Sequence, residues 1–135
     1  MNNIDRFFTG DPVIFAGAYI DYLSEVLKRI DVNSIGRFIQ TLLEARERGA
    51  TVYLIGNGGS AATASHFAND LAFGTNSYDR PFRAVSLADN QAVMTAIAND
   101  FGYEDVFVRQ LRVLGKPGDV LIGISASGNS PNLLN

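Results

Sequence analysis

The sequence predicts an α/β fold in which a parallel sheet with covering helices follows a pair of N-terminal helices. Three observations support this prediction: a helical spacing of apolar residues before residue 49, three short apolar runs after it, and helical segments between those runs. Strands that alternate with helices are joined by right-handed crossovers, which makes their sheet parallel. A chain of 135 residues has the size of about one domain.

The first predicted helix begins at Pro12, because Asp11 can cap it and a proline at the first helical position removes no hydrogen bond. A second helix is predicted from about Asp31 to Gly49. Apolar residues of the first helix follow one another at spacings of three and four: Val13, Ala16, Ile20, Leu23, Leu27 and Ile30. This apolar seam indicates either packing between the two helices or association of subunits. Residues 1–48 are therefore expected to form a helical pair for packing or oligomerisation.

The α/β part, residues 49–135, is expected to alternate strands and helices. The order is strand 51–55, helix 61–72, strand 82–88, helix 91–98, helix 104–114 and strand 120–124. The first strand lacks an apolar–polar alternation, which is typical of a parallel strand buried on both faces. Asp89 and Asn90 are candidate caps of the helix that follows them, and residues 99–102 end it. Only about one helical turn follows the last loop, so we expect a fragment of a longer domain.

The composition excludes several classes of protein. With 47% hydrophobic and 19% charged residues the chain is compact, and without cysteine it has no disulfide, thiol nucleophile or thiolate metal site. No apolar run approaches the ~20 residues that cross a bilayer. A net charge of −3 without a basic stripe argues against nucleic acid as a partner. We expect a soluble, cytoplasmic protein whose ligand is small or is another protein.

Two polar loops follow the first and third predicted strands. We call residues 56–60 the glycine loop and residues 125–130 the serine loop. Both lie at the carboxyl ends of parallel strands, where such sheets bind ligands, and both lead into a helix N-terminus. Hydroxyl groups beside exposed backbone N–H groups suit a phosphate monoester. We therefore expect the two loops to converge on one phosphate-binding pocket.

Other interpretations of these loops remain open. Each loop alone could be a tight strand-to-helix turn. Gly56, Gly58 and Ala61 also fit the dinucleotide-binding fingerprint, but Asp89 lies further along than the ~20 residues usual for its acidic partner. The fingerprint also leaves the serine loop without a role.

His66 is the only histidine and lies one helical turn before Asp70, so both project from one face of the predicted helix. The pair could bind a metal, act as general acid and base, or form a structural hydrogen bond. Asn99 and Asp100 could bind sugar hydroxyls or end their helix.

Three blocks together resemble the phosphoheptose isomerase branch of the sugar isomerase (SIS) domains: residues 56–62 with His66 downstream, Thr95–Asp105 and Gly118–Ser130. The resemblance covers residues ~50–135 closely, and the N-terminal helical pair fits the same branch. It implies a flavodoxin-like SIS domain of about five parallel strands with helices on both faces, assembled as a dimer or homotetramer. The C-terminal half of such a domain is missing from these residues.

The resemblance also implies an aldose–ketose isomerase that converts sedoheptulose 7-phosphate to D-glycero-manno-heptose 7-phosphate. It assigns His66 and Asp70 as catalytic residues and zinc ligands. The implied substrate-binding residues are Asn57, Gly58, Gly59, Ser60, Asn99, Asp100, Ser125, Ala126, Ser127 and Ser130.

Two departures from the family pattern weaken the catalytic implication. The first is Asp70, which stands where the family has a longer Glu, and the second is the missing C-terminal half. Ala126 also stands in place of the usual Thr. The family's remaining zinc ligands and second acid/base residue, a Gln and a His, belong to the missing half, so the Zn²⁺ site is incomplete in this chain. The alternative is a non-catalytic SIS protein that binds a sugar phosphate or a protein partner, similar to the replication-initiator-associating protein.

Overall fold

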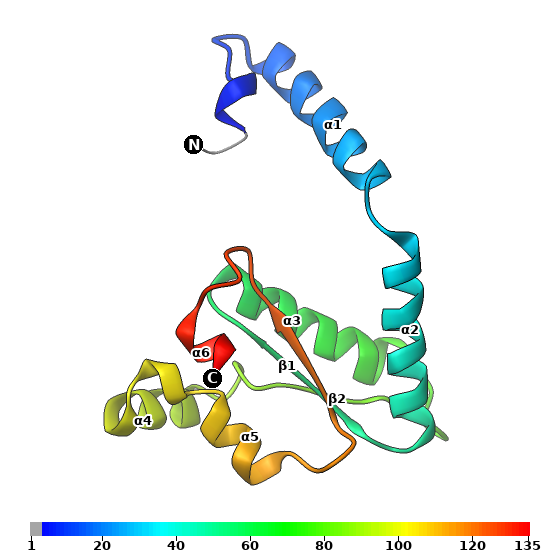
Figure 1. The fold of residues 1–135 in the computed structure, drawn as a ribbon, viewed down its shortest axis with the longest axis vertical. Helices are drawn as coiled ribbons and strands as arrows, with labels where there is room; N and C mark the ends of the chain where they lie inside the picture. The colour runs from blue at the N-terminus through cyan, green and yellow to red at the C-terminus, as the bar shows by residue number, and fades with distance from the viewer. Residues whose placement is uncertain (1–3) are drawn as a thin grey trace. The chain divides into compact units, whose positions relative to one another are not determined.

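The computed structural model describes residues 4–135, which divide into two compact units, one ending at Phe38 and one beginning at Ile39 (Figure 1). The boundary falls inside α2 (Val32–Glu47). The predicted division into a helical pair over 1–48 and an SIS part over 49–135 remains a prediction. Over the described residues, no helix combines the length and apolar character that crossing a membrane requires.

The first unit contains a short 3₁₀ helix, η1 (Asp5–Phe7), and the long helix α1 (Pro12–Lys28). Asp11 Oδ1 accepts hydrogen bonds from the N–H groups of Val13 at 2.8 Å and Ile14 at 3.3 Å, which confirms the predicted cap. None of the residues of α1 is buried. Its apolar seam is therefore exposed.

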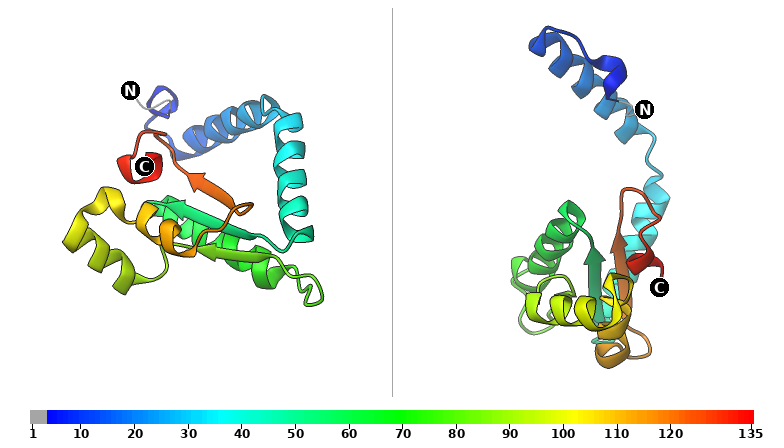
Figure 2. Two further views of the ribbon diagram at one scale, coloured as in Figure 1. Left: turned by 60° about the horizontal axis from the view of Figure 1, so that its bottom comes forward. Right: turned by 90° about the vertical axis from the view of Figure 1, so that its left-hand side faces the viewer.

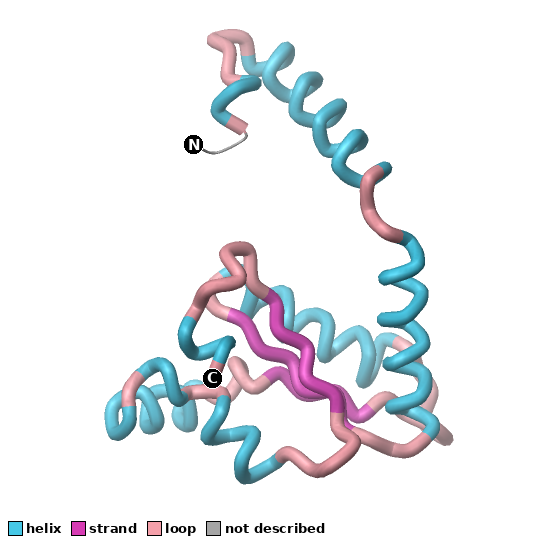
Figure 3. Tube along the Cα trace, viewed as in Figure 1, coloured by secondary structure: helices cyan, strands magenta, loops and turns pink. Residues whose placement is uncertain are grey.

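Three parallel strands form the sheet of the second unit: β1 (Thr51–Gly56), β2 (Arg83–Ser86) and β3 (Val120–Ile124). Their spatial order is β2-β1-β3, and Figure 3 shows them side by side in magenta. Leu54 pairs with Ser86 on one side and with Ile122 on the other. The predicted parallel sheet is confirmed, with β2 shorter than expected because the chain turns after Leu87.

The central strand β1 is buried on both faces, which explains its unbroken apolar run. Val52 and Leu54 belong to the core on one face, together with α2 and with α3 (Gly59–Asn69). Tyr53 and Ile55 belong to the core on the opposite face. That core includes residues of α4 (Gln91–Phe101) and α5 (Val108–Leu114), so helices cover both faces of the sheet (Figure 2).

Several predicted helix boundaries are wrong. α3 begins two residues early and ends at Asn69, where a π-helical segment, η2 (Asp70–Gly74), continues the chain. α4 runs on through Asn99 and Asp100 to Phe101, and it ends only where Gly102 adopts a φ of 103°. The helix predicted over 104–114 is divided into η3 (Tyr103–Asp105) and α5.

The cap of α4 is Asn90 and not Asp89. Asn90 Oδ1 accepts a hydrogen bond from the Val93 N–H at 3.1 Å. Asp89 instead accepts one from the Ser65 hydroxyl of α3. Of the two candidate caps, Asn90 therefore caps α4 and Asp89 does not.

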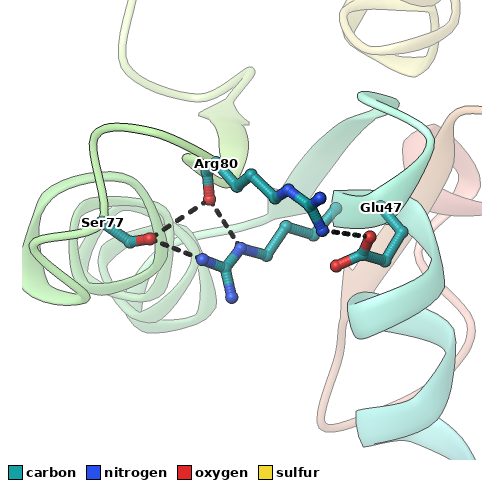
Figure 4. Close-up of polar contacts among 4 residues, drawn as sticks. Glu47, Ser77 and Arg80 are labelled. Carbon is teal, nitrogen blue, oxygen red and sulfur yellow. Dashed lines mark hydrogen bonds and ion pairs between the residues drawn. The ribbon is translucent and has the colours of Figure 1, made fainter.

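Arg46 of α2 holds the segment that leads into β2 by contacting Ser77 and Arg80, which are labelled in Figure 4. Its guanidinium donates to the Arg80 carbonyl at 2.6 Å and to the Ser77 hydroxyl at 2.5 Å, and it lies 5.2 Å from the centre of the Phe82 ring. Arg80 in turn pairs with Glu47 at 2.7 Å. These contacts tie the end of α2 to the entry of β2.

Candidate functional site

The glycine loop makes a turn between β1 and α3 that requires glycine at two positions. A Cβ at Gly56 would lie 2.6 Å from the carbonyl carbon and oxygen of Ser60, so no side chain fits there. Gly58 has a φ of 55°, which L side chains rarely adopt. The Ser60 N–H closes the turn on the Asn57 carbonyl at 3.0 Å.

Two hydroxyl groups of the serine loop accept hydrogen bonds from the loop's own backbone. Ser125 Oγ accepts a hydrogen bond from the Gly128 N–H at 3.0 Å, and Ser127 Oγ accepts one from the Asn129 N–H at 3.3 Å. A hydroxyl that accepts in this way still has its own hydrogen to donate. Both side chains belong to exposed residues, so they present O–H donors to solvent.

One residue of each loop lines a shared pocket: Asn57 of the glycine loop and Ser130 of the serine loop. The side chains of Asn57 and Asn132 exchange two hydrogen bonds of 2.8 Å, which join the glycine loop to α6 (Pro131–Leu134), the helix after the serine loop. The Tyr103 hydroxyl donates to Asn57 Oδ1 at 3.0 Å. A pocket of about 220 Å³ lies here, lined by Asn57, Tyr103, Glu104, Ser130, Pro131 and Asn132.

His66 and Asp70 lie on one face of α3 and its continuation, with Nε2 of His66 3.4 Å from Oδ2 of Asp70. Their side chains are 76% and 60% exposed, so water screens this pair. Both line a second pocket of about 430 Å³ together with Ala62, Thr63 and Phe67. This pocket shares no lining residue with the pocket between the loops.

A zinc site is not complete within residues 4–135. No group of three or more His, Cys, Asp or Glu residues there is placed to hold a metal ion. His66 and Asp70 offer two donors, whereas zinc sites in proteins use three or four protein ligands. These residues alone do not fit the ion.

The remaining predicted site residues lie outside the pocket between the loops. Asn99 and Asp100 are exposed at the end of α4 and hydrogen-bond each other at 2.8 Å. The others that do not line the pocket are Gly58, Gly59, Ser60, Ser125, Ala126 and Ser127. Of the predicted substrate-binding residues, the pocket lining brings together Asn57 and Ser130.

The sequence did not single out Asn132 and Tyr103, although both contact Asn57. Asn132 is only 4% exposed, which is unusual for an asparagine in a terminal helical turn. Tyr103 follows the helix end at Gly102, within a block already noted for its resemblance. Neither position carries a local signal, because their role depends on segments that are distant in the sequence.

Comparison with known protein families identifies one match. The family described as "SIS domain" matches residues 18–135 of the chain. A phosphoheptose isomerase of Helicobacter pylori is 43% identical over 115 residues, which are 85% of this chain and 56% of the relative. A probable phosphoheptose isomerase of Thermoplasma acidophilum is 38% identical over 119 residues, or 88% of this chain and 65% of the relative.

Solved structures show the same fold. The phosphoheptose isomerase of Neisseria gonorrhoeae superposes with a TM-score of 0.78 at 36% identity, covering 88% of this chain and 62% of that one. The one from Francisella tularensis gives a TM-score of 0.77 at 27% identity, covering 99% and 66%. The chain thus spans between about half and two thirds of the length of the relatives it matches.

Proposed function

Because the chain belongs to the SIS domain family, we propose that its activity is the aldose–ketose isomerisation of a phosphorylated sugar, sedoheptulose 7-phosphate. The observation that carries the proposal is the convergence of the glycine and serine loops on one pocket. The relatives named phosphoheptose isomerases support the choice of substrate.

The serine loop is the proposed phosphate site. Ser125 and Ser127 accept hydrogen bonds from the loop backbone and keep their hydroxyl hydrogens for phosphate oxygens. Ser130 lines the pocket and makes no capping hydrogen bond with its side chain. Three hydroxyls can thus donate hydrogen bonds to the phosphate oxygens in a loop that contains no basic residue.

The proton transfer is assigned to His66 of α3 and Asp70 of η2. Isomerisation needs a base that removes a proton from the carbon beside the carbonyl group. In this proposal the Asp70 carboxylate is that base, and His66 lies beside it at 3.4 Å. Zinc is also part of this proposal, and His66 and Asp70 would supply two of its ligands.

We also propose that the chain forms a homo-oligomer through α1. In α1 the seam residues Val13, Ile20 and Leu27 are 78%, 61% and 57% exposed. An apolar stripe of this kind is typical of a surface that another helix covers. We assign it to association with further copies of the chain, and a phosphorylated sugar substrate favours a cytoplasmic location.

Binding and conversion of sedoheptulose 7-phosphate test the proposal. Titration calorimetry should show binding that is lost when sedoheptulose without phosphate replaces it, and NMR with zinc present should show the aldose product. No binding, or equal binding of both sugars, contradicts the phosphate site. A greater rise in melting temperature with NAD than with the sugar phosphate would support the dinucleotide interpretation.

A second candidate is the non-catalytic SIS protein that binds a sugar phosphate or a partner. The separation of the His66–Asp70 pocket from the loop pocket favours it, because neither residue lines the place where the loops meet. Binding of the sugar phosphate without any conversion, with zinc supplied, would select this candidate.

A further inference from the structure

Most hydrogen-bonding sites of the Asn57 side chain are filled by other side chains of the protein. Its Oδ1 accepts hydrogen bonds from the Tyr103 hydroxyl at 3.0 Å and from Asn132 Nδ2 at 2.8 Å. Its Nδ2 donates to Asn132 Oδ1 at 2.8 Å. A carboxamide offers two acceptor sites and two N–H donors, so both acceptor sites are filled and one N–H remains.

Three segments that are distant in the sequence fix this one side chain. Asn57 belongs to the glycine loop, Tyr103 to η3 after α4, and Asn132 to α6 after the serine loop. Asn132 is 4% exposed, so breaking its reciprocal pair leaves buried polar groups without partners. Tyr103 is 53% exposed, and it lines the pocket beside Asn57.

We propose that Asn132 and Tyr103 are positioning residues of the sugar-phosphate site, which act by holding Asn57 and so fix the glycine loop beside the serine loop. This inference rests on the proposed function and deepens it. It also defines what Asn57 can recognise. With its oxygen occupied, the side chain meets a ligand only as a donor, so its partner is an acceptor oxygen on the sugar.

A single hydroxyl deletion tests the inference. Tyr103→Phe keeps the ring and removes the hydrogen bond to Asn57, and Tyr78→Phe is the matched control because Tyr78 is 78% exposed and does not line the loop pocket. We expect Tyr103→Phe to raise the Kd for sedoheptulose 7-phosphate about threefold to tenfold. The Kd for inorganic phosphate, which needs only the serine loop, should stay unchanged.

Comparing the Kd values of the two ligands distinguishes a positioning role of Tyr103 from a general loosening of the site. A merely structural effect of Tyr103→Phe would weaken sugar phosphate and inorganic phosphate alike, and that result would overturn the inference. An unchanged Kd for both ligands would overturn it too.

Amide hydrogen exchange gives a readout that needs no ligand. We expect the amides of Gly58, Gly59 and Ser60 to exchange faster in Tyr103→Phe than in wild type or in Tyr78→Phe. Equal exchange in all three proteins overturns the inference. If wild type binds neither ligand, the proposed function fails, and the exchange rates still decide whether Tyr103 holds the glycine loop.

Discussion

The backbone N–H of Thr51 donates a hydrogen bond to Asp119 Oδ1 at 2.8 Å, which joins the beginning of β1 to the turn before β3. Asp119 Oδ2 accepts a second one from the Lys116 N–H at 2.8 Å. These hydrogen bonds hold the pKa of Asp119 below its ordinary value, and the bond from Thr51 has the largest effect. One carboxylate therefore stabilises the entry of two neighbouring strands at the edge opposite the loops.

Protonation of Asp119 should destabilise the fold at acid pH. The pKa of Asp119 is lower in the folded chain than the ~3.9 of an unfolded aspartate. Its contribution to stability is therefore complete above pH ~3.9 and is lost as the pH falls through the folded pKa. We expect Asp119→Asn to lower the melting temperature at pH 7 and to reduce its fall between about pH 5 and pH 2. Thermal unfolding followed by circular dichroism measures both. The control is Asp79→Asn, at an exposed residue, and parallel pH curves for wild type and Asp119→Asn would contradict the prediction.

Gly56→Ala should disrupt the glycine loop. The new methyl group would lie 2.6 Å from the backbone of Ser60, so the turn must open at a cost of about 1–3 kcal/mol in the free energy of unfolding. Gly17→Ala is the matched control, since no atom lies within 4 Å of the Cβ position in α1 and alanine favours a helix. Urea denaturation compares the two variants. Equal stability of Gly56→Ala and wild type would contradict the tight turn.

Ser127→Ala should weaken binding of sedoheptulose 7-phosphate by about 1–2 kcal/mol, because one proposed hydroxyl donor to the phosphate is lost. The fold should stay intact, since Ser127 is exposed. Ser24→Ala, on the exposed surface of α1, serves as control. Calorimetry measures the affinities, and an unchanged Kd would remove Ser127 from the phosphate site.

Leu23→Asp should separate the subunits of the proposed oligomer. A carboxylate in the apolar seam of α1 would have to lose water on association, which is costly without a partner charge. Ile14→Asp is the matched control, because Ile14 is 60% exposed on the same helix but outside the seam. Light scattering gives the mass of each variant. If Leu23→Asp keeps the mass of wild type, the seam is not the subunit interface.

The strands and most helices could be predicted from the sequence because apolar spacing and capping residues are local. Asp11 before Pro12 specified the start of α1, and the apolar run before Ile124 specified β3. The sequence predicts the end of α4 too early, because the polar residues Asn99 and Asp100 are typical helix breakers whereas the helix ends at Gly102. The polar residues at the helix end matter less than the positive φ that follows them.

The candidate site could be predicted only in part. The glycine pattern placed a turn after β1, and parallel strands placed both loops at one edge of the sheet. No local pattern predicts that Asn132 is buried against Asn57, because the two residues lie 75 positions apart in the sequence. The separation of His66 and Asp70 from the loop pocket also depends on the packing of α3.

The paired carboxamides of Asn57 and Asn132 have a thermodynamic consequence. Asn57→Ala and Asn132→Ala would each remove the same two hydrogen bonds, so their costs overlap. In a double-mutant cycle, the losses of unfolding free energy in the two single variants should therefore sum to more than the loss in the double variant.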